Sequence, residues 1–464
     1  MILKLNFRLK VFDSFTFLKD INPIWYYNLY PENASSFSTY YLNPEYVKIS
    51  KEGEGLYEKD ERYSNETAKL LDIGYQLWNK GELLFTDNAE YPKLILEEKL
   101  SLKDNYIFVR KYFKSHRVYY FLLKNLLRLS NPFKEFKALK ETKSVKKADL
   151  IKPHCEYRDY EKFDSKLTAS LPLVSIIIPT LNRYKYLKDV IEDLEKQDYE
   201  NIEIVIIDQT DDPDKKFYDN FKINLKVIFQ KGKGQWLSRN EAVRNCKGDY
   251  LLFFDDDSRV DKDWVYQHLK SLDYFKADIS AGVSLSTTGD SIPENYSFFR
   301  WADQFDSGNA MVKREVFLKT GMFDRQFDKQ RMGDGEFGMR AFLAGFRCIS
   351  NPLAKRIHLK IGTGGLRELG SWDAFRPKNF FAPRPIPSVL YYYRKYFPGS
   401  YVVNALILGM YPSLIPYKWK SKKYLYPLSA LVALFIFPLL LIQLGISWSR
   451  SSKMLKEGDR IEWL

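Results

Sequence analysis

Cysteine is scarce in this chain, and its three copies lie far apart at Cys155, Cys246 and Cys348. No two of them stand at the C-x-x-C spacing that redox motifs and many zinc sites use. The sequence therefore argues against a disulfide framework or a zinc site, and it indicates a reducing compartment. No internal repeat of the solenoid kind is present either.

The sequence also lacks a long cluster of basic residues, although lysine and arginine outnumber aspartate and glutamate by 72 to 59. The resulting formal charge of +13 is spread along the chain, and no nucleic-acid-binding motif accompanies it. No nucleic acid is therefore expected as a partner. The positive excess instead favours an anionic membrane surface or phosphate-bearing substrates.

A cleavable signal peptide is not expected, because charged residues interrupt residues 1–18. Near the other end, residues 424–449 form an uncharged stretch that is long enough to cross a bilayer. We predict a transmembrane helix there, preceded by an interfacial amphipathic segment over 386–423 and followed by a basic tail over 450–464. The expected location is the inner (plasma) membrane of the cell, with the catalytic domain in the cytoplasm.

The length of 464 residues suggests two to three domains. Residues 1–149 carry no motif that we can interpret, and we predict a mixed α/β accessory domain of unknown function. Residues 106–109 look strand-like there, whereas 66–78 and 118–129 look helical. Residues 150–170 are rich in charge and poor in apolar side chains, which is typical of a linker.

Residues 171–385 alternate between continuous apolar runs and segments with helical periodicity. The predicted strands are 174–178, 202–207, 225–229 and 250–254. This alternation predicts an α/β domain with a largely parallel sheet, in which ligands bind at the carboxyl ends of the strands. Polar residues follow three of these ends (Pro179 and Thr180, Asp208, and Asp255 to Asp257), so one site is expected at that edge.

The segment 250–257 is the most informative, because five apolar or aromatic residues run directly into three aspartates. Adjacent carboxylates repel one another, so a divalent cation or strong hydrogen bonds must offset the cost of folding them together. The alternative is a solvated acidic turn that follows a strand.

Five motifs now resemble those of family 2 glycosyltransferases, which have a GT-A fold. They are Val174-Ser-Ile-Ile-Ile-Pro-Thr-Leu-Asn-Arg183, Ile204-Val-Ile-Ile-Asp208, Ser238-Arg-Asn240, the stretch Gly248 to Asp257, and Gly333-Asp-Gly-Glu-Phe-Gly-Met-Arg340. The resemblance covers about residues 171–365. It implies an inverting transfer of a sugar from a nucleotide donor, most simply a UDP-sugar, to a hydroxyl group.

The resemblance also implies which residues bind the nucleotide sugar. Asp208 would accept a hydrogen bond from the uracil imide, and Asp256 would hold the ribose or a metal-bound water. The other expected contacts come from strand ends and helix starts: Pro179, Thr180, Arg183, Arg239, Asn240 and Asp255. Arg183 and Arg239 could instead be ordinary surface residues, and Asp255 could mainly hold the shape of the loop.

A Mg²⁺ or Mn²⁺ ion is the cofactor that the resemblance implies, since oxygen ligands and phosphate partners favour these ions over zinc. Asp257 is the first candidate ligand, and His358 would complete the site, although a lone histidine is more often structural. The glycine-rich residues 362–365 are expected to fold over the phosphates, because glycines let backbone N–H groups approach them.

An inverting reaction needs a base beside the acceptor, and the family places a Glu-Asp pair at the start of a helix for this purpose. Here Gly333 replaces the glutamate, and Asp334 aligns with the base. Glu336 is a competing candidate, and both acids could simply favour the start of a helix. The resemblance implies acceptor-side contacts for Gly308 and Asn309. Trp301 could stack on a sugar ring there, although a single aromatic residue is more often part of the core.

The expected enzyme transfers sugar to a saccharide or a lipid-linked saccharide for a surface glycan. A processive synthase is disfavoured because the Gln-x-x-Arg-Trp signature and multiple spans are missing from the sequence. A catalytically silent sugar-nucleotide-binding or scaffold protein remains the main alternative, and a hydrolase that uses the paired acids is a third.

Overall fold

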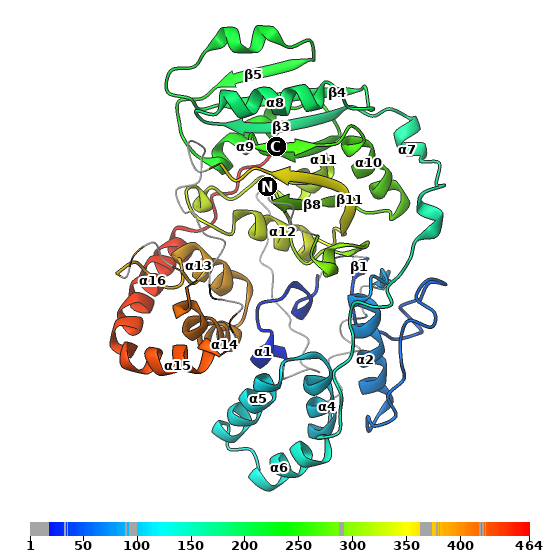
Figure 1. Cartoon of the computed structure of the whole chain (residues 1–464), viewed down its shortest axis with the longest axis vertical. Coiled ribbons are helices and arrows are strands. Elements are labelled where there is room, and N and C mark those ends of the chain that lie inside the picture. The colour runs from blue at the N-terminus through cyan, green and yellow to red at the C-terminus, as the bar shows by residue number, and fades with distance from the viewer. Residues whose placement is uncertain are drawn as a thin grey trace. The chain divides into compact units, whose positions relative to one another are not determined.

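The computed structural model describes residues 18–31, 34, 36–88, 91, 100–286, 292–361, 374–376, 379, 381–416, 419, 422 and 424–464. The chain forms two compact units, and each is assembled from two separate stretches (Figure 1). The first unit contains residues 1–155 and 375–450, and the second contains 156–374 and 451–464. The segments expected to be independent membrane elements therefore fold largely with the accessory residues.

The second unit is built on a nine-stranded sheet over the described residues, with the order β5-β4-β3-β6-β10-β8-β11-β7 and with β9 paired to β11. The strands are β3 (Val174–Thr180), β4 (Ile202–Asp208), β5 (Leu225–Phe229), β6 (Tyr250–Phe254), β7 (Ser258–Val260), β8 (Ile279–Ser286), β9 (Arg300–Trp301), β10 (Asn309–Lys313) and β11 (Cys348–His358).

The sheet has two halves with different strand directions. Strands β5, β4, β3 and β6 are parallel, as their continuous apolar runs predict. Beyond β6 the pairing is mixed: β10 is antiparallel to both of its neighbours, and β8 and β11 are parallel to each other. The expectation of a largely parallel sheet is therefore right for the first half and wrong for the second, where β10, β7 and β9 run antiparallel to the strands they pair with.

Helix α8 buries the apolar face that its periodicity predicts. In α8 the predicted residues Leu187, Val190, Ile191 and Leu194 are all buried. The helices of this unit are α7 (Lys166–Ala169), α8 (Tyr184–Leu194), α9 (Gln235–Asn245), α10 (Trp264–Tyr274), α11 (Arg314–Thr320) and α12 (Gly333–Leu343).

The first unit is mainly helical over its described residues. Its elements are α1 (Leu18–Ile21), β1 (Phe37–Ser38), α2 (Glu66–Asn79), β2 (Phe85–Thr86), α4 (Leu102–Tyr112), α5 (Ser115–Leu127), α6 (Pro132–Glu141), α13 (Pro387–Tyr396), α14 (Gly399–Met410), α15 (Leu425–Phe435) and the greater part of α16 (Phe437–Glu457). The strand expected at 106–109 is wrong, because these residues lie within α4. They are buried throughout, so a short apolar run gave no periodicity with which to tell a helix from a strand.

The predicted span over 424–449 is not one helix. It is broken between α15 and α16, whose axes bend by 79°, and among the described residues no single helix is long and apolar enough to cross a membrane. The pair meets the length and composition requirements only when taken together. Pro438 explains the break, since proline lacks an N–H donor and fits only the first turn of a new helix.

Candidate active site

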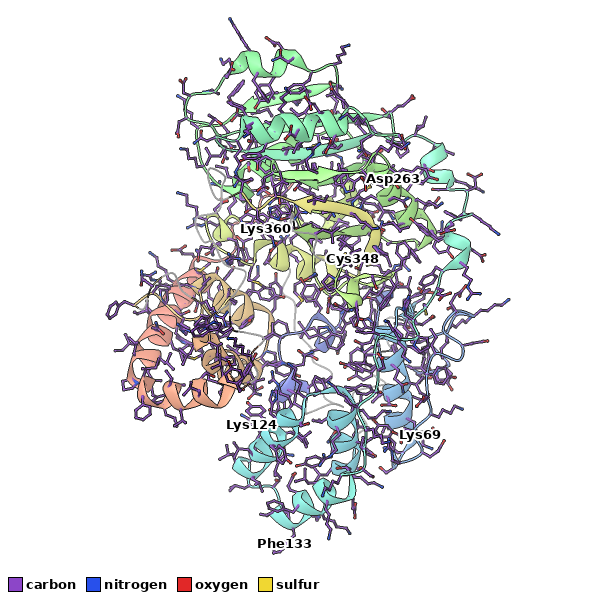
Figure 2. All side chains as sticks on the ribbon, in the orientation of Figure 1. Lys69, Lys124, Phe133, Asp263, Cys348 and Lys360 are labelled. Atoms are coloured by element: carbon purple, nitrogen blue, oxygen red, sulfur yellow. The ribbon has the colours of Figure 1, made fainter. Side chains whose placement is uncertain are left out.

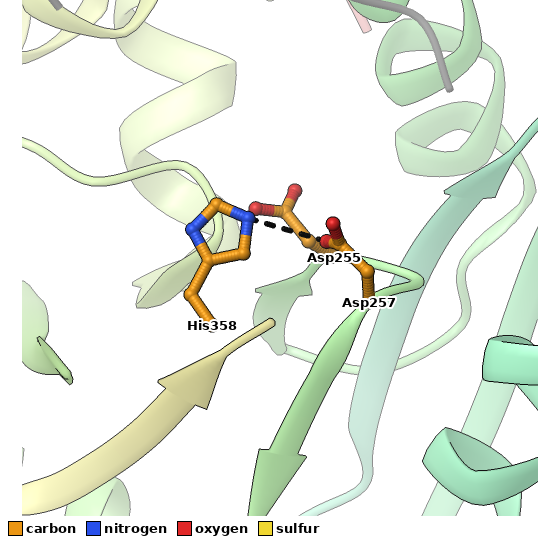
Figure 3. A group of neighbouring side chains, drawn as sticks. All are labelled: Asp255, Asp257 and His358. Atoms are coloured by element: carbon orange, nitrogen blue, oxygen red, sulfur yellow. Dashed lines mark ion pairs between the residues drawn. The ribbon is translucent and has the colours of Figure 1, made fainter. Parts of the chain in front are cut away.

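The acidic residues and the histidine meet where β6 and β11 end (Figure 3). Asp255 to Asp257 follow β6 directly, and the chain then forms β7, which pairs with β11 so that Ser258 lies opposite His358. The backbone N–H of Leu359 donates to the Asp257 carbonyl at 2.9 Å. The antiparallel pairing therefore brings a histidine that is distant in sequence beside the aspartates.

Asp255, Asp257 and His358 form a group suited to one divalent cation. One ligand atom from each residue lies within 4.8 Å of the other two. His358 Nε2 lies 3.2 Å from Asp257 Oδ1, and the imidazole points toward both carboxylates in Figure 3. Two carboxylates and an imidazole are ligands that Mn²⁺ and Mg²⁺ accept. Asp255 thus joins the predicted ligands Asp257 and His358 in this group. Its contacts, described next, also fit the prediction that it holds the shape of the loop.

Asp255 is held from both sides by buried arginines. Its Oδ1 accepts from Arg239 Nη2 at 2.9 Å, and its Oδ2 accepts from Arg356 Nη1 at 2.7 Å. Arg356 also pairs with Asp306 at 3.1 Å. Sequence reasoning missed Arg356, although it stands two residues before His358 in β11 and so faces the same side of the strand.

Asp256 and Asp257 share a third arginine. Arg183 Nη1 lies 2.9 Å from Asp256 and 3.1 Å from Asp257, and Thr180 donates to Asp256 at 2.8 Å. Burial raises the pKa of Asp256 to about 6, and Arg183 opposes part of that rise. Burial also acts to raise the pKa of Asp257, but the hydrogen bond with His358 and the positive charges of His358 and Arg183 together lower it below its usual value. The structure thus brings Thr180 and Arg183 to the acidic cluster, beside Pro179 at the end of β3.

Asp208 ends β4 opposite Thr180, in register across the sheet. Its Oδ2 accepts from the hydroxyls of Tyr184 at 2.5 Å and Tyr218 at 2.9 Å, and its Oδ1 accepts the N–H of Thr210. Burial and the Asp208 carboxylate raise the pKa of Tyr184 to about 12, so this tyrosine stays a donor at neutral pH. The two tyrosines were not predicted, and they hold the carboxylate that we expect to face the base.

Arg239 and Asn240 were expected to contact the nucleotide sugar directly. Both are fully buried, so the structure gives them a supporting role behind the site instead. Arg239 holds Asp255 from behind, as described above. Asn240 donates from Nδ2 to the Phe323 carbonyl at 2.8 Å and accepts the Phe323 N–H at 2.9 Å. It therefore fixes the segment around Phe323.

Two of the expected acceptor-side residues also lie in the core. Asn309 accepts from Trp264 Nε1 at 2.8 Å and donates to two backbone carbonyls, and Trp301 is 1% exposed within β9. Neither side chain is placed to contact a sugar. Gly308 lies directly behind the cluster, since a Cβ there would approach Asp255 Oδ2 to 2.3 Å. The predicted phosphate loop at 362–365 falls outside the described residues.

The two candidate bases at the start of α12 differ sharply. Glu336 is fully buried, and its carboxylate pairs with Arg340 at 3.0 and 3.1 Å, so it is a structural ion pair and not a base. Arg340 in turn donates to the carbonyls of Thr320, Gly321 and Met322, which fixes the preceding loop. Asp334 is partly exposed in the first turn, where Oδ1 accepts the N–H of Gly335 at 2.9 Å.

Trp236 connects the start of α12 to the acidic cluster. Its indole fills the space beside Gly333, where an added Cβ would lie 2.3 Å from Trp236 Cε2. The indole also lies beside Arg239, whose guanidinium carbon is 5.3 Å from the ring centre and which binds Asp255. Any side chain at position 333 would therefore meet this indole, and the glycine that stands in place of the family's glutamate avoids that contact.

The C-terminal tail, residues 459–464, packs on the loop that leads from α11 to α12. The N–H of Met322 donates to the Glu462 carbonyl at 2.8 Å, and the N–H of Arg460 donates to Asp324 at 3.1 Å. The tail was expected to flank a membrane span, and no sequence signal indicated that it belongs to the catalytic unit. The loop before α12 is therefore held by Asn240, Arg340 and the tail together.

A sheet with a parallel half, acidic residues at the strand ends and a mixed continuation defines a GT-A-like glycosyltransferase fold. Residues 175–339 match the family model "Glycosyl transferase family 2". This segment is a family 2 glycosyltransferase domain, and the prediction made from its motifs is confirmed.

Curated relatives agree with this assignment. The chain is 26% identical to glycosyltransferase GlyG of Streptococcus pneumoniae over 199 residues, which are 41% of this chain and 60% of that protein. It is 34% identical to chondroitin synthase of Escherichia coli over 135 residues, which are 28% of this chain and 19% of that one. The similarity thus covers about 60% of the first relative and a smaller part of the second.

Two solved structures are similar over larger parts of the chain. The mannosyltransferase PcManGT of Pyrobaculum calidifontis, in complex with GDP-Man and Mn²⁺, aligns with a TM-score of 0.42 and 16% identity, covering 65% of this chain and 93% of that one. The fragment 1–349 of Staphylococcus aureus TarS, in complex with UDP-GlcNAc, aligns with a TM-score of 0.42 and 21% identity, covering 60% of this chain and 81% of that fragment.

Proposed function

We propose that this chain is a metal-dependent, inverting glycosyltransferase that moves a sugar from a nucleotide sugar, most simply a UDP-sugar, to a hydroxyl group of a saccharide. The observation that carries the proposal is the group of Asp255, Asp257 and His358 at the strand ends of a family 2 domain. These three residues would hold Mg²⁺ or Mn²⁺. A bound ion would neutralise charge on the departing nucleoside diphosphate.

The remaining residues divide the work of binding and proton transfer. Asp208, aligned by Tyr184 and Tyr218, accepts a hydrogen bond from the nucleotide base. Arg183 stands beside two of the aspartates, where its guanidinium offers donors for phosphate or ribose. Asp334 takes the proton of the acceptor hydroxyl as that oxygen attacks the anomeric carbon.

We further propose that the acceptor is a saccharide or a lipid-linked saccharide, and that the enzyme works on a surface glycan at the cytoplasmic face of the inner membrane. The apolar but bent pair α15 and α16 supports an association with lipid. Relatives with matching domains include a transferase named for a dolichyl-phosphate-linked sugar, in Methanococcus voltae, at 26% identity over 207 residues.

The test is release of nucleoside diphosphate from a panel of nucleotide sugars, with Mn²⁺ or EDTA and with or without saccharide acceptors. We expect release that needs both the metal and an acceptor, and that Asp257→Asn removes. Tight, metal-dependent nucleotide binding without turnover on any acceptor would favour the silent binding protein instead. Release without an acceptor would favour a hydrolase.

A further inference from the structure

Helix α5 has two apolar faces, of which only one is needed for packing in its unit. The inner face is buried and carries Val118, Phe121 and Leu122. The outer face exposes Tyr119, Leu123 and Leu127 to solvent. These three are spaced four residues apart, so they lie in one stripe along the helix. A helix that packs on a single core does not require this second stripe.

The exposed apolar surface continues around the turn into α6. Leu129 is 92% exposed and Phe133 is 86% exposed, and Phe136 follows one turn later on the same outer face. Leu129 has a φ of 60°, a left-handed conformation that ends α5, and the Asn131 side chain caps α6 by accepting the N–H of Phe133. Figure 2 shows Phe133 at the outer end of this hairpin. The backbone thus presents these side chains in a defined position.

The same surface is strongly basic. Residues 114–143 contain eight lysines and arginines but only two glutamates. Lys134, Lys137 and Lys140 are exposed on α6 beside the phenylalanines. Glu135 is turned inward and accepts a hydrogen bond from Tyr106 at 2.7 Å, so it does not balance the outer face. Arg128 pairs with Asp20 at 2.6 Å and Lys137 lies 3.9 Å from Glu141, so part of this charge is balanced. The hairpin still combines large apolar side chains with an excess of positive charge.

We propose that the α5–α6 hairpin docks on an anionic lipid bilayer. Its apolar side chains stand on a projecting turn, from which they can enter the acyl boundary, and lysines keep their ammonium groups at the headgroups while their stems contact apolar surface. Positive charge complements anionic lipid, and soluble proteins rarely expose contiguous apolar patches of this kind without a partner. The inference concerns a surface in the first unit and holds whether or not the chain transfers sugar.

The test places a probe on the hairpin of the full chain. Phe133→Cys is labelled with a polarity-sensitive fluorophore, and the unmodified chain, whose Cys155 and Cys246 are buried, gives the background labelling. We expect a blue shift with vesicles containing phosphatidylserine, quenching by brominated acyl chains, and little change with phosphatidylcholine alone. The exposed Lys59 of the same unit, labelled as Lys59→Cys, should not respond.

Charge variants test the electrostatic part of the proposal. Replacing Lys134, Lys137 and Lys140 with glutamate should weaken the vesicle response at least about tenfold. The same replacement at Lys48, Lys51 and Lys59, which are exposed elsewhere in this unit, should have a much smaller effect. Circular dichroism confirms that both variants are folded.

Three results would overturn the proposal. The first is a probe that ignores both kinds of vesicle. The second is a probe already shielded before vesicles are added, which would mean that the chain itself or a second copy covers the hairpin. The third is an equal loss from the two triple variants, which would reflect net charge alone. Nucleoside diphosphate release with a soluble acceptor, measured on the same variants, tests the proposed transferase activity separately.

Discussion

The contact between Gly333 and Trp236 makes a sharp prediction about the proposed base. In Gly333→Ala the new methyl group would lie 2.3 Å from Trp236 Cε2 and 2.5 Å from Nε1. The indole cannot simply swing away, because it is 3% exposed and its Nε1 donates to the Phe327 carbonyl at 3.0 Å. Either the ring or the first turn of α12 must therefore move, and Asp334 lies in that turn.

The size of the effect follows from this crowding. Forcing an extra carbon into a packed site costs about 1–3 kcal/mol of unfolding free energy. A displacement of roughly 1 Å at a catalytic group can lower turnover about 100-fold. We therefore expect Gly333→Ala to be measurably less stable in a denaturant titration. Its kcat for nucleoside diphosphate release should fall while the affinity for the nucleotide changes little.

Gly335→Ala is the matched control, since it stands in the same turn and its methyl group would meet only the flexible end of Met332, at 3.0 Å. It should be neutral or stabilising by about 0.5–1 kcal/mol, because alanine is the better helix former. In the background of Trp236→Ala the penalty of Gly333→Ala should largely disappear. If the two glycine variants behave alike, the indole does not position this turn and the reasoning is refuted.

Three further outcomes are expected. Asp334→Asn should lower kcat about 100-fold or more without unfolding the protein. Glu336→Gln breaks a buried ion pair, so it should mainly lower the free energy of unfolding, by about 3 kcal/mol in a denaturant titration. The reverse pattern would exchange the roles of the two acids. Removing residues 459–464 breaks the two bonds described above and a third, from the N–H of Arg325 to the Arg460 carbonyl. At about 1 kcal/mol per bond this should destabilise the catalytic unit by roughly 3 kcal/mol and lower turnover; an unchanged enzyme would show that the tail is dispensable. Burial lowers the pKa of His268 to about 4, below its ordinary 6.5, so the unfolded state takes up a proton at a higher pH than the folded state does. The free energy of unfolding should therefore fall by about 2 kcal/mol as the pH drops from 7 to 5. A His268→Gln variant whose unfolding free energy depends on pH in the same way would contradict this.

The parallel half of the sheet could be predicted because its signal is local. The strands at 174–178, 202–207, 225–229 and 250–254 are continuous apolar runs, and the observed strands include all four. The acids that follow them identify the functional edge for the same reason. The mixed half gives a weaker signal, since β7 and β9 are very short, β11 shifts register between Asn351 and Lys355, and the partners of these strands are set by packing at long range.

The supporting residues could not be predicted because they act through contacts between distant segments. Arg356 reaches Asp255 across about a hundred positions of sequence, and the tail reaches Met322 from the far end of the chain. Asn309 shows the opposite error, since its position in the family motif suggested contact with the acceptor. The structure shows instead that its amide makes four hydrogen bonds inside the protein. A motif thus locates a residue in the chain without saying which way its side chain faces.

The acidic cluster also raises the question of how three adjacent aspartates fold together. The sequence suggested that a cation or strong hydrogen bonds must offset their repulsion, and the structure provides three guanidinium groups. Arg239 and Arg356 hold Asp255, while Arg183 lies between Asp256 and Asp257. Arg356 is shared with Asp306, so four carboxylates face three guanidinium groups and the cluster keeps about one net negative charge. A divalent cation placed there would leave about one net positive charge, which a nucleoside diphosphate would balance. The electrostatics of these side chains therefore favour binding of cation and nucleotide together over binding of either one alone.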